Sequence, residues 1–217
     1  MQRMKDNVDN ILSDNKENML CFRLMNSAMF MQLWHNKKDN QKIIINDDPN
    51  LNEAFYKQAL DNIFPSSPHA AWRPFQLAFI LLNLDGIINH PQDYGWKKRN
   101  NLVDLVWFPT GGGKTEAYLG IIALCIIYRR KKYGEQGYGV ATIMRYTLRL
   151  LTTQQFQRAL RLILALEQMR RWGKKNVKFD LGTKPISIGL YVGSNSLPNK
   201  VDGKDGLDDE SLKWDRR

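Results

Sequence analysis

The chain has few cysteines and histidines and lacks an apolar run long enough to span a membrane. Its 217 residues include two cysteines, Cys21 and Cys125, and three scattered histidines, with no C-x-x-C pair. This argues against a structural zinc site and favours a reduced, intracellular protein. The longest apolar stretch, residues 117–128, is too short for a bilayer, and the charged, Asn-rich start is no signal peptide. We expect no membrane association and a cytoplasmic location.

Basic residues and apolar residues are both plentiful. Lys and Arg number 32 against 22 Asp and Glu, giving a formal net charge of +10, and 43% of the residues are hydrophobic. The apolar content supports a packed core, with one domain or one domain plus a helical extension. The charge suits a polyanionic partner such as nucleic acid, although a basic protein without such a partner would have the same composition.

The apolar pattern divides the chain near residue 70. Residues 1–70 read as a helical N-terminal extension, with apolar runs at 19–34 and 51–63. From residue 71, short apolar runs at 102–108, 140–144 and 185–192 read as strands. They alternate with helices at 116–132 and 152–172, which glycines 134 and 173 would end. This alternation predicts an α/β domain with a parallel sheet.

A glycine-rich loop lies between the first predicted strand and its helix: Pro109-Thr110-Gly111-Gly112-Gly113-Lys114-Thr115. Consecutive glycines let the backbone close around an anion with its N–H groups inward, and the helix N-terminus adds a positive dipole end. Lys114 would reach the β- and γ-phosphates, and the Thr115 hydroxyl would hold Mg²⁺. The sequence predicts an ATP and Mg²⁺ site at this loop; the alternative is a glycine loop that binds nothing.

Phe108 occupies the position where the pattern G-x-x-x-x-G-K-[ST] has its first glycine. The loop instead resembles motif I of superfamily 2 helicases, written [AP]-T-G-x-G-K-T. That resemblance implies that residues 71–217 are the first part of a RecA-like helicase ATP-binding domain. It also implies that Gln76, upstream of motif I, reads the adenine edge, with Phe75 or Trp72 stacking on the base. The alternative is an exposed glutamine without that role.

Downstream, residues 147–154 resemble helicase motif Ia, P-T-R-E-L-A-x-Q, at Arg149, Leu151 and Gln154. The resemblance implies that Arg145, Arg149 and Gln154 contact the nucleic-acid backbone, DNA more than RNA. The arginines could instead cap helix and strand ends or pair with carboxylates. The later arginines 158, 161, 170 and 171 are expected to form a solvated helix face.

The amino-acid sequence around motifs I and Ia looks most like that of the large helicase-like protein of the DISARM anti-phage defence system. This implies an ATP-dependent nucleic-acid helicase or translocase. The family's acidic motif II is missing, because Asp208-Asp209-Glu210-Ser211 follows a polar loop instead of an apolar strand. We therefore assign no catalytic residue and expect little hydrolysis by this chain alone.

Three functional hypotheses stay open at this point. The chain could be the N-terminal piece of a truncated or split motor that a downstream chain completes. It could also be a non-catalytic module that binds nucleotide and nucleic acid. A P-loop kinase or GTPase-like switch is the third, but it leaves Gln76 and the motif Ia resemblance unexplained.

Overall fold

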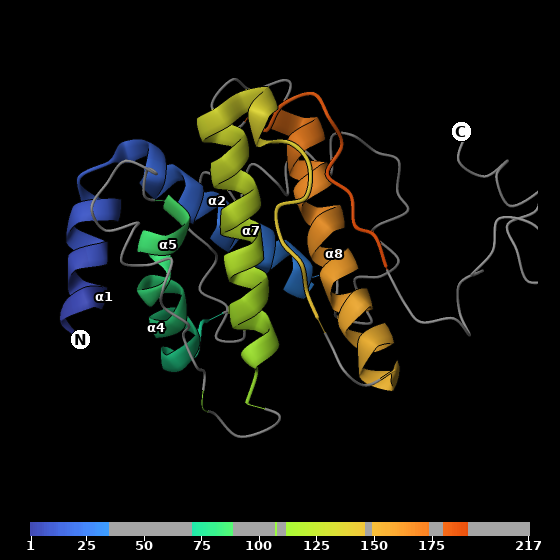
Figure 1. Cartoon of the computed structure of the whole chain (residues 1–217), viewed down its shortest axis with the longest axis horizontal. Helices are drawn as coiled ribbons and strands as arrows, with labels where there is room; N and C mark the ends of the chain where they lie inside the picture. The colour runs from blue at the N-terminus through green and yellow to red at the C-terminus, as the bar shows by residue number, and fades with distance from the viewer. Residues whose placement is uncertain (35–70, 89–106, 108–111, 146–148, 174–179, 191–217) are drawn as a thin grey trace, which may run out of the picture. The chain divides into compact units, whose positions relative to one another are not determined.

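The computed structural model describes residues 1–34, 71–88, 107, 112–145, 149–173 and 180–190, with only the backbone of residues 34 and 149–153. Helices make up its regular structure (Figure 1). In chain order they are α1 (Gln2–Asn7), the π-helix η1 (Val8–Ser13), α2 (Lys16–Trp34), α4 (Pro74–Leu82), α5 (Leu84–Ile88), α7 (Lys114–Tyr133), the 3₁₀ helix η4 (Gly134–Gly137) and α8 (Arg149–Gly173).

The long helices lie where the sequence predicts them. The apolar run at 19–34 falls in α2, the helix predicted at 116–132 is α7, and the one predicted at 152–172 is α8. Gly134 follows α7 with a positive φ of 53°, a conformation that glycine adopts at little cost, and α8 ends at Gly173. The glycine signals for helix ends are therefore confirmed.

The predicted parallel sheet is wrong for the part of the chain that the structure describes. Residues 140–144 and 185–190 have no strand assignment. Val140 and Ile143 are 76% and 88% exposed instead of packed, and Trp107, the one described residue of the run at 102–108, is 90% exposed. A strand exists only by pairing with a neighbour, and no described segment supplies that ladder. The α/β class with a RecA-like sheet is therefore not seen.

Helices α7 and α8 run parallel to each other, and a long connecting segment, which we call the return segment, leads from the end of α7 back to the start of α8. Helices α7 and α8 both start at the lower end of Figure 1, and residues 138–145 run back along them between the two. An ion pair between Glu116 and Arg158, 3.6 Å apart, connects the first turns of α7 with α8. The apolar run at 140–144 is thus part of an irregular connecting segment between two helices.

The core forms where α2 packs against α7 and α8, with α4 on another side of α7. Each helix contributes side chains at helical spacing, so that one stripe is buried. The buried residues are Cys21, Leu24, Met25 and Ala28 from α2, Leu119, Ala123, Leu124 and Ile127 from α7, and Leu162, Ala165, Leu166 and Met169 from α8. Residues Met1–Ser187 form one compact unit, and residues 188–217 are a second.

Polar contacts attach the N-terminal helices to the rest of this unit. The Arg3 guanidinium donates to the Leu82 carbonyl at 2.9 Å, and Asn7 donates to the Leu81 carbonyl at 2.8 Å. The boundary expected near residue 70 falls outside the described residues and stays a prediction. Among the described helices, none combines the length and apolarity needed to cross a bilayer.

A buried arginine near the end of α7 holds residues 180–187, which we call the strap. Arg130 donates to the carbonyls of Leu181 at 3.0 Å, Lys184 at 2.6 Å and Pro185 at 3.0 Å. Its guanidinium also lies 4.8 Å from the ring centre of Tyr138. Burial lowers the pKa of Arg130 from its usual value. One side chain therefore satisfies three carbonyls of a segment that has no regular structure.

A second buried arginine holds the strap from α8. Arg170 donates to the carbonyls of Gly182 and Thr183 and pairs with both carboxylate oxygens of Glu167, at 2.6 and 2.7 Å. Glu167 also accepts from the Ile186 backbone N–H at 2.9 Å. The expected solvated arginine face is therefore wrong at Arg170, which is 5% exposed. Its charge is offset by Glu167 one turn earlier.

Candidate nucleotide-binding site

The site starts at the N-terminus of α4, which the sequence Arg73-Pro74-Phe75-Gln76 builds. Arg73 is extended, with φ −66° and ψ 146°, as expected for a residue before proline, and Pro74 takes the first helical position. The Gln76 side-chain oxygen accepts from the Arg73 N–H at 2.9 Å. This contact is half of a capping box, and it turns the Gln76 amide toward the start of the helix.

The same two residues hold the glycine-rich loop. The Gln76 Nε2 donates to the Gly113 carbonyl at 2.7 Å, and the Arg73 Nη1 donates to the Gly112 carbonyl at 2.8 Å. Gln76 is 5% exposed, whereas Arg73 is exposed. Two consecutive loop carbonyls are thus fixed from one side by the start of α4.

Holding a carbonyl also orients the N–H of the same peptide group. In a trans peptide the C=O and the following N–H point in opposite directions, and the described residues contain no cis peptide. The N–H groups of Gly113 and Lys114 are therefore directed to the side away from Gln76 and Arg73. That is the arrangement in which consecutive amides form a concave site for an anion.

Gly113 is the residue that this geometry requires to be glycine. Its φ of 90° and ψ of 29° lie in the left-handed region, where a side chain is strained. A Cβ at this position would lie 2.7 Å from Gln76 Nε2, closer than van der Waals contact allows. Backbone and neighbour both demand the absence of a side chain, so the loop residues fit the close-wrapping turn that a phosphate site needs.

Helix α7 begins directly at Lys114 and runs for 20 residues. Lys114 and Thr115 are half-buried in its first turn, followed by Glu116, which pairs with Arg158 at 3.6 Å. An acidic residue in the first turn suits the positive end of the helix dipole, and Arg158 offsets its charge toward an arriving anion. The structure thus places Gln76, Gly112, Gly113, Lys114 and Thr115 in one neighbourhood. Thr110 and Gly111 lie outside the described residues.

Of the two residues predicted to stack on the base, Trp72 has contacts that place its ring. Trp72 donates through its ring N–H to the Asn26 side-chain oxygen at 2.7 Å, and a Cβ on Gly120 would meet its ring at 2.9 Å. The Trp72 ring therefore packs between α2 and α7. Phe75 is half-buried in the first turn of α4. The sequence analysis assigned no contact to Arg73. Its position directly before Pro74, the first residue of α4, is the sequence feature that could have indicated one.

The predicted nucleic-acid residues are only partly described. Arg145 is exposed at the end of the return segment, and Gln154 is exposed on α8. Helix α8 begins at Arg149, whose side chain is not described. Their role in nucleic-acid binding stays a prediction.

The described residues outside the glycine-rich loop give little support for a further metal site or for a reactive cysteine. No cluster of three or more His, Cys, Asp or Glu side chains occurs among the described residues. Mg²⁺ in phosphate sites takes one or two protein ligands and otherwise phosphate oxygens and water, so Thr115 fits as a single hydroxyl ligand. Burial raises the pKa of Cys21 to about 11 and also raises that of Cys125, so neither thiol is activated.

Comparison with known proteins finds sequence similarity to one relative. The chain is similar to the DISARM protein DrmA. That protein comes from Bacillus paralicheniformis and is 50% identical over 137 residues, which are 60% of this chain and 11% of the relative. The chain therefore matches a small part of a much longer protein. No family model and no solved structure matches. The similarity supports the DISARM relationship predicted from the sequence, whereas the superfamily 2 helicase resemblance stays a prediction.

Proposed function

We propose that this chain binds ATP and Mg²⁺ through residues 109–115 and serves as the nucleotide-binding portion of a nucleic-acid translocase or helicase in anti-phage defence. The observation that carries this proposal is the pair of contacts from Gln76 and Arg73 to the carbonyls of Gly113 and Gly112. These contacts orient the next two amides away from α4. The sequence Gly-Lys-Thr at the start of α7 gives those amides a cation and a hydroxyl beside them.

Each residue has a defined part in nucleotide binding. The amides of Gly113 and Lys114 donate to a phosphate oxygen, the Lys114 ammonium neutralises the β- and γ-phosphates, and the Thr115 hydroxyl contributes to Mg²⁺. Bound Mg²⁺ offsets phosphate charge and orients the terminal phosphate. The Gln76 amide has a second N–H and a second lone pair beyond the contacts it makes here, which are the groups that an adenine edge requires.

The first test replaces Lys114 with alanine. Lys114→Ala should abolish ATP binding in calorimetry with Mg²⁺ present, because the phosphates lose their cation. Alanine is a better helix former than lysine, so the helical circular dichroism should be kept. Lys132→Ala, an exposed lysine in the last turn of the same helix, is the matched control and should bind ATP like the wild type. Normal ATP affinity in Lys114→Ala would show that the site is wrongly assigned.

The second test concerns the nucleic-acid partner. Arg149→Ala should weaken binding of single-stranded DNA and reduce the dependence of log K on log[salt] by about one ion, because one phosphate contact is lost. Arg171→Ala removes an exposed arginine at the other end of α8 and is the control. An unchanged salt slope in Arg149→Ala would contradict the backbone-contact role.

A second candidate is a non-catalytic module that binds nucleotide and nucleic acid without turnover. The missing motif II favours it for this chain taken alone, since phosphoryl transfer needs groups that position the attacking water. Single-turnover hydrolysis of ATP with and without DNA separates the candidates. DNA-stimulated turnover by this chain would exclude the second candidate.

A further inference from the structure

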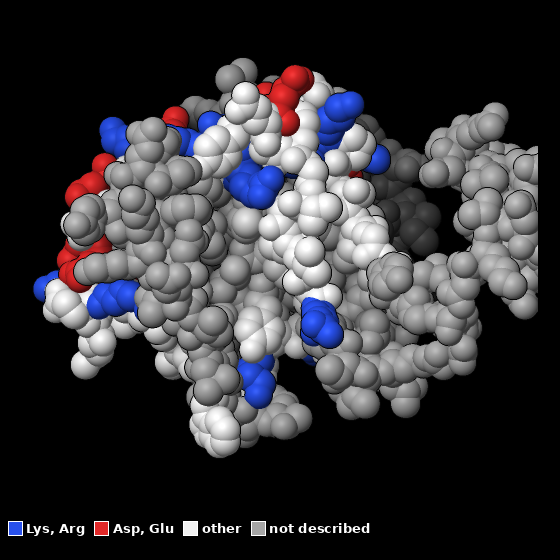
Figure 2. Space-filling model, in the orientation of Figure 1, with Lys and Arg blue, Asp and Glu red and all other residues white. Residues whose placement is uncertain are grey.

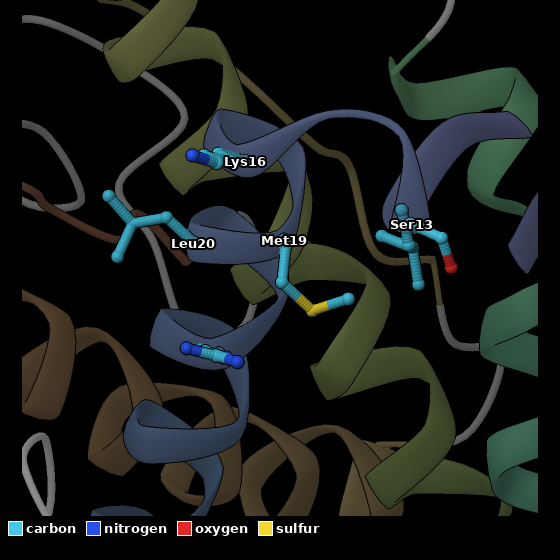
Figure 3. Close-up of a pocket in the computed structure, with 6 residues that line it drawn as sticks. Ser13, Lys16, Met19 and Leu20 are labelled. Atoms are coloured by element: carbon cyan, nitrogen blue, oxygen red, sulfur yellow. The ribbon is translucent and has the colours of Figure 1, made fainter. Parts of the chain in front are cut away.

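The N-terminal helices carry a surface hollow that nucleotide binding does not use. It lies where η1 meets α2, has a volume of about 380 Å³, and is lined by Leu12, Ser13, Lys16, Met19, Leu20 and Arg23. In Figure 3, Met19 points from α2 toward the end of η1, where Ser13 lies, while Lys16 and Leu20 extend from the other side of the helix. The hollow is therefore open between a helix and the turn that precedes it.

The lining residues form one stripe of α2. Lys16, Leu20 and Arg23 are spaced i, i+4 and i+7, so they share a face, and Met19 lies beside them. The buried face of the same helix, Cys21, Leu24, Met25 and Ala28, packs into the core. Helix α2 thus has two apolar stripes, one in the core and one half-exposed. Two exposed cations, about 10 Å apart along the axis, bound the half-exposed one.

Charge and shape together specify the occupant. The two cations stand before and after an apolar pair, and no ion pair to either is found among the described residues. A nucleic-acid backbone would contact the cations but leave Met19 and Leu20 unpartnered. An acidic amphipathic helix would cover the apolar pair and match both cations. Methionine suits such a surface because its side chain adapts to its partner.

We propose that this hollow is a docking site for an acidic amphipathic helix of a partner protein. Leucines of the partner at i, i+3 and i+4 would cover Met19 and Leu20, and acidic residues one turn before and after them would pair with Lys16 and Arg23. The proposal is independent of the nucleotide site, because the residues that line the hollow come from η1 and α2 and none belongs to the glycine-rich loop.

The test uses a labelled 18-residue helical peptide of Glu, Leu and Ala, with one leucine stripe bounded by glutamates, in fluorescence anisotropy. The peptide should bind the full chain, and a scrambled peptide of the same composition should bind at least ten-fold more weakly. The double variant Lys16→Glu with Arg23→Glu should lose about ten-fold or more in affinity, and should gain affinity for the same peptide with lysine in place of glutamate.

The matched control is Lys5→Glu with Lys132→Glu, two exposed lysines away from the hollow. Each double variant replaces two positive charges with two negative ones, so the net charge falls by four, from +10 to +6, in both. The control should keep the wild-type affinity within about two-fold. Equal losses in the two variants would show general charge attraction and overturn the proposal.

A second measurement does not depend on any substitution. With ¹³C-methyl methionine, the peptide should shift the resonance of Met19 and leave that of the buried Met25 unchanged. Equal binding of the scrambled peptide would overturn the proposal. A Met19 shift produced by a short duplex DNA in place of the peptide would do the same, in favour of nucleic acid.

Discussion

At the scale of single residues, Gln76 shows how one side chain can serve the fold and the site together. Its oxygen accepts from the backbone N–H of Arg73, the residue before α4, and its nitrogen donates to the Gly113 carbonyl. A sequence motif can suggest that this glutamine contacts the adenine of a nucleotide. The pattern cannot show that the amide is first used to fix the loop, because that contact joins residues 37 positions apart.

Gly113→Ala should destabilise the protein through two separable causes. The left-handed backbone costs about 1–2 kcal/mol for alanine, and the new methyl group would displace the Gln76 amide. Thermal unfolding of Gly113→Ala, Gln76→Ala and the double variant should show coupling, because Gln76→Ala removes the clash but keeps the backbone strain. Gly139→Ala, also at a positive φ but with nothing within 4 Å of a Cβ, is the control for strain alone. Strictly additive effects would contradict the contact.

Glu167 predicts how stability varies with pH. Burial raises the pKa of Glu167, but hydrogen bonds from Arg170, the Ile186 N–H and Arg171 outweigh it and lower the pKa from 4.5 to about 2. Because the folded pKa is the lower one, this stabilisation is complete above about pH 5 and is lost as the pH falls toward 2.

Glu167→Gln should remove that dependence. The variant should lose about 3–5 kcal/mol at neutral pH, because Arg170 stays buried without its partner, and its free energy of unfolding should fall less between pH 5 and pH 3 than that of the wild type. Glu135→Gln, on the short helix η4, is the control. Urea unfolding at each pH measures the effect, and parallel pH profiles would contradict it.

At the scale of elements, the strap depends on helix ends instead of on a neighbouring strand. Arg130→Lys keeps the charge but cannot reproduce the three contacts of a planar guanidinium. We expect backbone N–H exchange in residues 180–187 to accelerate by ten-fold or more, while exchange in the middle of α7 stays slow. Arg129→Lys, the preceding residue, is the control, and equal acceleration across α7 would indicate general unfolding instead.

Helices and their ends were predictable from sequence, but strand pairing was not. Runs of apolar residues at helical spacing and the glycines after Tyr133 and Trp172 mark α7 and α8 through local chemistry. Val140 and Ile143 have the composition of a strand, yet a strand also needs a partner elsewhere in the chain. In Figure 2 an uncharged band runs over the return segment between α7 and α8, where those exposed side chains belong.

At the scale of the whole molecule, the N-terminal helices are part of the support of the glycine-rich loop. Helix α2 packs on α7, and Trp72 connects Asn26 to the start of α4. Sequence periodicity found α2 but gave no sign of what it packs against, because burial of an apolar stripe does not name its partner.

Met25→Ala should test that support. Met25 is fully buried in α2, so truncation should cost about 2–5 kcal/mol and lower the melting temperature. Met19→Ala, half-exposed on the other stripe of the same helix, should cost less than about 1 kcal/mol. Equal effects of the two substitutions would show that α2 is not held in the core as described.

Because α7 and α8 run parallel, their helix dipoles point in the same direction. Two helices that start at the same end place two positive dipole ends there, each equivalent to roughly half a unit charge. Their negative ends lie together at the strap, where Arg130, Lys131, Lys132, Arg170 and Arg171 occupy the last turns. Arg130 and Arg170 donate there to carbonyls of the strap, so their positive charges lie beside the negative ends of both helices.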